Sequence, residues 1–270
     1  MGVLNVTPDS FSDGSKFYAE EHAIAHALRM ETEGADLIDI GAESTRPGSE
    51  GISAEEEWKR LLPVLGGLRR LLKIPISIDT QKAEVAETAL DAGAEIINDT
   101  SGLKNDPRIA EVAARRHVPL ILMHMRGEPR TMQTGPFARD VMKDVLQGLR
   151  KSVGIARKAG VPKSQIILDP GIGFGKSYAQ NYELLQKLPQ LAKLGYPLLV
   201  GTSRKGFLGA TLARDGKPVP PEERIWGTAA TVTASILCGA HIVRVHDVYE
   251  MVQVVRVADC VLDTKRAPRN

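Results

Sequence analysis

The stretch Ile166-Ile-Leu-Asp-Pro-Gly-Ile-Gly-Phe-Gly-Lys-Ser177 decides the fold. Three β-favouring apolar residues run into a carboxylate, Asp169, and then into a loop whose glycines let the backbone approach a ligand closely. Pro170 cannot continue a hydrogen-bonded ladder, and Ser177 is a good start for a helix over the apolar spacing that follows. The stretch therefore predicts a strand, a polar strand end, a loop and a helix.

Two other interpretations of this stretch can be weighed from the sequence. A phosphate-binding P-loop would need glycine where Pro170 stands, and the glycine spacing of dinucleotide sites is absent as well. A solvated turn with an incidental aspartate fits the stretch in isolation, since Asp and Gly are common in loops. The same pattern recurs along the chain, however, and this repetition favours a binding loop.

Short apolar runs alternate with amphipathic segments throughout the 270 residues. This alternation predicts parallel strands joined by helices, and the length suits one (β/α)8 TIM barrel of about 250 residues, with a doubly wound open sheet as the alternative fold. We expect one domain over residues 1–270, lacking a short N-terminal lead-in segment. The expected strands span 2–6, 37–40, 74–78, 95–98, 119–123, 166–168, 197–201 and 242–245. The expected helices span 20–33, 54–72, 82–92, 107–115, 138–159, 178–193, 221–238 and 248–262.

Glycines punctuate this repeat. Five of them each follow an expected helix and precede an expected strand, as helix C-caps in the left-handed conformation do. They are Gly34, Gly93, Gly160, Gly195 and Gly239.

Composition limits the kinds of partner. The 35 basic and 33 acidic residues give a net charge of +2, too small a field to indicate nucleic acid or membrane binding. No apolar run approaches the roughly 20 residues of a membrane span, and no signal peptide pattern opens the chain. Cys238 and Cys260 lie in apolar helical contexts, which predicts buried free thiols. We therefore expect a soluble, cytoplasmic protein that acts on small molecules.

Polar residues stand at or near the end of every expected strand. In a closed barrel these ends meet at one face, where active sites of this fold lie. One such residue could simply cap the next helix, but eight of them indicate a site. They are Asn5, Asp39, Asp79, Asn98, His124, Asp169, the segment 203–205 and His246. Two long loops rich in turn residues, 7–16 and 43–51, are either functional or disordered connections.

The polar residues divide into two chemical sets. Asp79, Asn98 and Asp169 offer acceptors to a flat heterocycle with N–H donors, such as a pterin, and Lys205 adds a donor. The second set suits a phosphate or pyrophosphate, with the Asn5 oxygen available to Mg2+. This set comprises Asn5, Arg46, Arg244 and His246. No spacing indicates a covalent nucleophile or a zinc cluster.

Taken together, these motifs resemble those of the dihydropteroate synthase family over nearly the whole chain. The matching stretches are residues 2–14 (GVLNVTPDSFSDG), 43–48 (ESTRPG), 77–80 (SIDT), 97–99 (IND), 169–176 (DPGIGFGK), 203–205 (SRK) and 244–247 (RVHD). The resemblance implies an enzyme that joins (7,8-dihydropterin-6-yl)methyl diphosphate to 4-aminobenzoate and releases pyrophosphate. It also implies Mg2+ as cofactor, a homodimer and a target for sulfonamides.

The resemblance also implies roles for single residues. Asp79, Asn98, Asp169, Phe174 and Lys205 would hold the pterin, and Asn5, Arg46, Arg244 and His246 would hold the diphosphate, with Asn5 on the metal. Thr45, Pro47 and Ser203 would form the 4-aminobenzoate pocket. Arg46, Lys205, Arg244 and His246 would act in catalysis, with Arg46 and His246 stabilising charge and not forming a covalent bond.

One position departs from the family pattern. Gly206 stands where many members have a second serine, so one hydroxyl for the aminobenzoate carboxylate is missing, although backbone N–H groups of a following helix could replace it. Two other functions remain open. They are a methyltetrahydrofolate:corrinoid methyltransferase domain, which has no use for a pyrophosphate clamp, and a catalytically silent pterin-binding relative.

Overall fold

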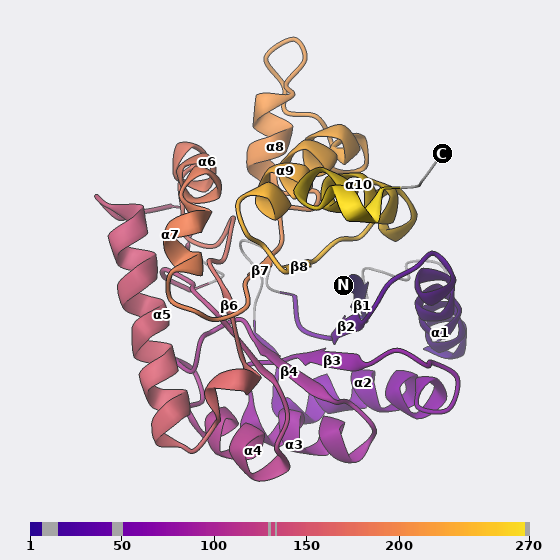
Figure 1. Ribbon diagram of the computed structural model, residues 1–270. Helices are drawn as coiled ribbons and strands as arrows, with labels where there is room; N and C mark the ends of the chain where they lie inside the picture. The colour runs from indigo at the N-terminus through magenta and orange to yellow at the C-terminus, as the bar shows by residue number, and fades with distance from the viewer. Residues whose placement is uncertain (7–15, 45–50, 129–130, 133, 268–270) are drawn as a thin grey trace.

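The eight apolar runs form eight short parallel strands. The computed structural model describes residues 1–6, 16–44, 51–128, 131–132 and 134–267 (Figure 1). The strands are β1 (Gly2–Asn5), β2 (Ile38–Gly41), β3 (Ile76–Asp79), β4 (Ile96–Asp99), β5 (Leu120–Met123), β6 (Ile166–Asp169), β7 (Leu199–Val200) and β8 (Ile242–Val243).

Strand pairing closes the sheet into a ring. Strands β1 to β6 pair in chain order, and β7 pairs with β8. Single parallel bridges, Leu168 to Leu198 and Gly2 to Val245, connect these two sheets on both sides. The Val3 amide donates to the Val245 carbonyl at 3.0 Å, so the last strand lies beside the first. The predicted (β/α)8 barrel is therefore confirmed, and the open sheet is wrong.

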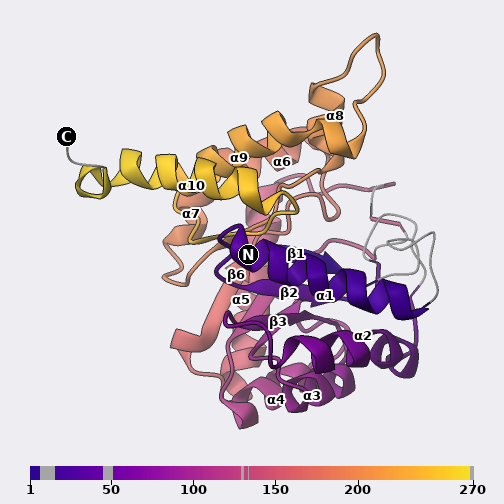
Figure 2. The same cartoon turned by 90° about the vertical axis from the view of Figure 1, so that its right-hand side faces the viewer.

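Helices surround the strands in chain order (Figures 1 and 2). The α-helices are α1 (Lys16–Thr32), α2 (Ala54–Leu68), α3 (Ala83–Asp91), α4 (Arg108–Arg116), α5 (Val141–Lys158), α6 (Tyr178–Gln186), α7 (Leu188–Ala192), α8 (Gly206–Thr211), α9 (Ile225–Leu237) and α10 (Val248–Leu262). Short 3-10 turns are η2 (Lys163–Gln165), η3 (Pro221–Glu223) and η4 (Thr264–Arg266).

Three helical predictions require correction. The expected helix 221–238 is the 3-10 turn η3 followed by α9, which begins at Ile225. The expected helix 178–193 is two helices, α6 and α7, because Pro189 has no N–H to continue the ladder and instead occupies the first turn of α7. Helix α8, directly after the segment 203–205, is an element that the sequence pattern does not predict. The five predicted C-cap glycines all have positive φ, between 73° and 112°, which confirms their role as helix ends.

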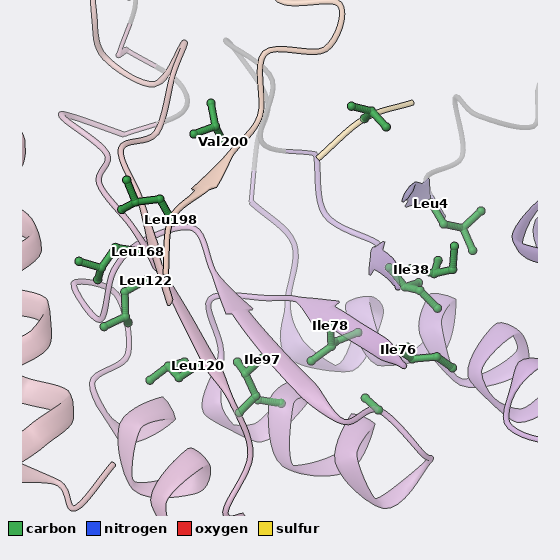
Figure 3. Packing of buried hydrophobic residues seen from close by; sticks show 14 of the residues in the cluster. Leu4, Ile38, Ile76, Ile78, Ile97, Leu120, Leu122, Leu168, Leu198 and Val200 are labelled. Carbon is green, nitrogen blue, oxygen red and sulfur yellow. The ribbon is translucent and has the colours of Figure 1, made fainter. Parts of the chain in front are cut away.

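The two faces of the strands carry different residues, because side chains alternate across a strand. The outer face is aliphatic and packs under the helices in one large buried cluster (Figure 3). Its strand members include Leu4, Ile40, Ile78, Ile97, Leu122 and Leu168. A core of this kind needs few aromatic residues, in keeping with the 4% in the chain.

The inner face is apolar in two places. One is the C-terminal end of β5, where the buried Met123 packs with Met125, Met132 and the half-buried Phe174. The other is the N-terminal end of the barrel. Met1, Ile121 and Leu199 form a small separate cluster there, with four half-buried aliphatic residues around it. Polar side chains follow toward the other end of the barrel, among them the buried Asp39, Ser77 and Asn98. The barrel thus has an apolar N-terminal end and a mainly polar C-terminal end, with the methionine cluster at the end of β5.

Two further expectations do not depend on topology. Cys238 and Cys260 are free thiols as predicted, although both are half-buried and not buried. Among the described residues, no helix combines the length and the apolar character that crossing a membrane requires.

Two glycines of α5 provide a matched test of this packing. Gly154 is exposed and nothing lies within 4 Å of the place an alanine methyl would take, so Gly154→Ala should raise the free energy of unfolding by about 0.5–1 kcal/mol through better helix propensity. A methyl group at Gly148 would collide with the His124 ring, so Gly148→Ala should lower it by about 1–3 kcal/mol. Denaturant titration measures both, and equal effects of the two variants would contradict the packing.

Candidate active site

Strand register brings the predicted polar ends to the same end of the barrel. Asn5 pairs with Gly41, which in turn pairs with Asp79. Asp79 pairs with Asn98, and Met123 pairs with Asp169 further round the ring. The C-terminal ends of the strands therefore meet at one end of the barrel, as the sequence predicted.

A charged cluster crosses the inside of the barrel. The Arg244 guanidinium donates from Nε to Asp39 Oδ2 at 2.7 Å and from Nη2 to Asp79 Oδ2 at 3.1 Å. Asn98 Nδ2 donates to the same Asp39 oxygen at 3.0 Å. Within the described part of the chain, Asp39 Oδ1 and Ser77 Oγ are buried without a hydrogen-bond partner. Buried polar atoms are rarely left unpaired, so these two mark capacity for a ligand.

Burial shifts the charge state of the carboxylates. It raises the pKa of Asp79 to about 8, with Asp39 adding to the shift and Arg244 opposing it. It raises the pKa of Asp169 to about 6, although the Gly171 N–H donates to Asp169 Oδ1 at 2.7 Å and favours the charged form. Asp169 is therefore mainly ionised at pH 7 and can accept N–H donors.

Lys205 lies over an aromatic ring within reach of these groups. Its Nζ is 4.1 Å from the centre of the Phe174 ring, a cation–π distance. Burial, and then the charge of Arg244, lower the pKa of Lys205 to about 8. Asp169 and Asp79 act in the opposite direction on the same pKa, which puts all four groups in one electrostatic neighbourhood.

Ser203 and His246 join the ends of β7 and β8. The His246 backbone N–H donates to Ser203 Oγ at 3.1 Å, and His246 Nδ1 lies 3.0 Å from the same oxygen. Burial, with Arg244 the largest of the nearby charges, lowers the pKa of His246 to about 3. The imidazole is therefore neutral at pH 7 and can donate a hydrogen bond. Arg204 pairs with Asp247 behind this contact.

The structure brings most of the predicted site residues together. Those at the C-terminal end of the barrel are Asn5, Asp79, Asn98, Asp169, Phe174, Ser203, Lys205, Arg244 and His246. Thr45, Arg46 and Pro47, and most of the two long loops, lie outside the described residues.

Arg244, a member of the predicted anion-binding set, contacts a residue of the predicted pterin set, Asp79. The sequence grouped it with the anion-binding residues, whereas its Nε and Nη2 bond to Asp39 and Asp79. The reason is that β8 closes against β1, so its side chain reaches inward to carboxylates that need a cation. Arg244 thus joins the two sets.

Asp39 has a structural role at the site that the sequence did not predict. The sequence marks it as a polar strand end without assigning it a role, yet it is fully buried and bonds both Arg244 and Asn98. The available signal was its position inside the apolar run Ile38-Asp-Ile40, because a charged residue inside a buried strand is rare unless it is paired.

Comparison with known proteins identifies the family. The model of the pterin binding enzyme family matches residues 1–246, so the chain belongs to that family. It is 52% identical, over 96% of its length and 88% of the relative, to dihydropteroate synthase from Synechocystis sp.. Within the family the chain is thus placed among the dihydropteroate synthases.

Solved structures agree with this placement. A Xanthomonas albilineans dihydropteroate synthase with 4-aminobenzoic acid has a TM-score of 0.90 and 42% identity, covering 99% of this chain and 93% of that one. A Yersinia pestis dihydropteroate synthase in a sulfonamide drug complex has a TM-score of 0.89 and 43% identity, covering 97% of this chain and 93% of that one.

The raised pKa of Asp169 predicts a pH dependence of pterin binding. Above pH 6 the group is a carboxylate, and below it the group becomes a neutral acid that loses its charge-assisted contact. We expect the Kd for a pterin, measured by calorimetry, to rise as pH falls from about 7.5 to about 5. Asp169→Asn should bind more weakly with a flat profile, and a flat wild-type profile would contradict the assignment.

Proposed function

We propose that this protein is a cytoplasmic transferase that joins (7,8-dihydropterin-6-yl)methyl diphosphate to 4-aminobenzoate, giving 7,8-dihydropteroate and pyrophosphate. The observation that carries the proposal is the charged cluster inside the barrel mouth, Asp39, Asp79 and Arg244, beside Lys205 over Phe174. In a chain of this family, that cluster supports a flat heterocycle on one side and a polyanion on the other.

The pterin would lie among the acceptors of the inner face. Asp169, ionised at pH 7, would accept two adjacent N–H donors of the heterocycle, a strongly orienting contact. Asp79 and Asn98 would bond the rest of its edge, and Phe174 and Lys205 would flank the ring. Such a site fixes the exocyclic carbon relative to the diphosphate.

The diphosphate would be held by Asn5, Arg46, Arg244 and His246. Burial works against the charge of Arg244, but Asp39 and Asp79 outweigh it and raise its pKa, so this cation is permanent. His246 is neutral and would contribute a hydrogen bond to the departing group. Donors aimed at a developing charge are worth about 100-fold each in rate.

Mg2+ fits this arrangement as a metal that arrives with the substrate. Among the described residues no group of three His, Cys, Asp or Glu side chains could hold a metal alone. Mg2+ is usually bound through one or two protein carboxylates together with substrate phosphates, and here the amide oxygen of Asn5 would take the place of a carboxylate. When bound, the metal would neutralise charge on the leaving diphosphate.

The reaction follows from these roles. The exocyclic C–O bond breaks and its electron pair leaves with the diphosphate, so that the pterin carries a delocalised cation. The amine nitrogen of 4-aminobenzoate then attacks that carbon, and the ammonium so formed passes its proton to the released diphosphate. Thr45, Pro47 and Ser203 would orient this second substrate, and the loops 7–16 and 43–51 would exclude water.

Helix α8 begins at Gly206, so its first backbone N–H groups could face the carboxylate of 4-aminobenzoate in place of the missing serine hydroxyl.

An assay with both substrates and Mg2+ tests the proposal. The wild type should produce dihydropteroate and pyrophosphate in equal amounts. His246→Ala should lower kcat about 100-fold because the leaving group loses a donor, whereas His22→Ala, on the exposed side of α1, should not. Pterin binding without any product would favour the silent relative, and methyl transfer from methyltetrahydrofolate would favour the methyltransferase.

We also propose that the protein is a homodimer through α9 and α10, which pack side by side (Figure 2). Large apolar side chains are exposed on both, including Trp226 at 78%, Tyr249 at 59%, Val257 at 67% and Val261 at 65%. Val257 and Val261 are one turn apart on the same side of α10, and Tyr249 lies about two turns before Val257, so the three form a broad apolar stripe along the helix. A stripe of this kind supports contact with a second copy.

Introducing a charged side chain into the apolar stripe of α10 should dissociate the proposed dimer. Val257→Glu should convert the dimer to a monomer in light scattering after gel filtration, because a carboxylate would be buried without a partner. Leu71→Glu, at a position 50% exposed but outside the stripe, should leave the dimer intact. A wild type that runs as a monomer would contradict the proposal.

A further inference from the structure

Lys176 is buried although it belongs to neither predicted ligand set. It is 1% exposed and is among the largest fully buried side chains of the residues described. Burying an ammonium group is costly unless it is fully hydrogen-bonded. Its position therefore requires a reason.

The ammonium group of Lys176 is fully used within the protein. Nζ donates to the Phe174 carbonyl at 2.9 Å and to the His124 carbonyl at 3.0 Å, and lies 3.1 Å from His124 Nδ1. Burial lowers the pKa of the His124 imidazole to about 2, so the ring is neutral and Nδ1 can accept. Burial lowers the pKa of Lys176 to about 7. Its charged form has three donors and no acceptor, and all three donors have partners within the protein, so none remains for a ligand.

These bonds tie two site-forming segments to each other. Phe174 lies in the loop that follows β6, whereas His124 follows β5 directly. His124 is fixed in turn on its other side, where Nε2 lies 3.5 Å from Asp144 of α5. Lys176 therefore connects the loop after β6 to β5 and the helix behind it.

The loop is shaped for this close contact. Gly171 has φ +65°, and a side chain there would collide with the carbonyl oxygen of His124. The Gly173 amide donates to Asn181 Oδ1 of α6 at 2.6 Å, which holds the middle of the loop. The loop therefore packs directly against the backbone of His124, whose carbonyl accepts a hydrogen bond from Lys176.

The same loop presents the groups assigned to the pterin. Asp169 begins it, and the Phe174 ring lies 4.1 Å from Lys205 Nζ. Because Lys176 bonds the Phe174 carbonyl, it fixes the backbone from which that ring projects.

We propose that Lys176 is a positioning residue for pterin recognition, which acts by clamping the loop 170–175 against β5 so that Phe174 and Lys205 keep their spacing. The inference rests on the proposed function for its ligand. The clamp itself does not depend on catalysis and can be measured without substrate.

The test compares Lys176→Met, which keeps the length but removes the donors, with Lys187→Met, a partly exposed lysine at the end of α6 paired with Glu183. Hydrogen exchange of peptides covering 169–177 should be at least tenfold faster in Lys176→Met only, with β1 to β4 unchanged. The Kd for 6-hydroxymethylpterin should rise at least tenfold, while KM for 4-aminobenzoate at saturating pterin diphosphate stays within twofold.

The outcomes separate the two proposals. Wild-type exchange and wild-type pterin Kd in folded Lys176→Met would overturn the clamp, as would a loss of thermal stability without any selective loss of pterin affinity. A wild-type protein that binds no pterin would instead contradict the proposed function. If Lys176→Met does not fold, His124→Leu removes one of the three acceptors, and its loop exchange and pterin Kd should change two- to fivefold. No change in either would overturn the clamp.

Discussion

Two carboxyl groups inside the barrel, those of Asp39 and Asp79, share the guanidinium of Arg244. The arrangement of the polar side chains at the C-terminal end of the barrel depends on this contact. Asp39 is fully buried, Asp79 lies nearer the barrel mouth at the end of the next strand, and Arg244 bonds both. Breaking a buried ion pair by removing one partner costs about 3–5 kcal/mol. The guanidinium follows the last strand and the two carboxyl groups come from the second and third, so the cluster can form only when the ring is closed.

Stability and chemistry are divided between the two faces of the strands. The outer face holds the large aliphatic core, and the inner face holds the ionisable groups above a small apolar base. Alternation along each strand makes this division possible, since neighbouring residues serve different purposes. Buried polar residues on the inner face would destabilise the fold by themselves. They are tolerated because the aliphatic outer face supplies the driving force for folding.

The sequence patterns predicted helices, strands and helix caps more reliably than they predicted contacts between residues far apart in the chain. Eight apolar runs, the glycine caps and the polar strand ends required only local rules, and all appear in the structure. Pro189 is also a local signal, because a proline inside an expected helix marks the end of one helix or the start of another, and here it separates α6 from α7 within the expected helix 178–193. The contacts of Arg244 and Lys176 were not accessible in this way, since they join residues 165 and 52 positions apart. Such contacts depend on ring closure and on backbone approach, which periodicity does not encode.

Strands β7 and β8 are two residues long and meet the rest of the ring through single bridges. Ser203, Lys205 and His246 all follow these strands, so the residues nearest the proposed bond-breaking step stand on the least hydrogen-bonded sector of the wall. From the shorter ladders we expect that sector to be more compliant than the continuous six-stranded arc. One side of the mouth would then yield by small amounts as bulky reactants enter and products depart, while the opposite side keeps its shape.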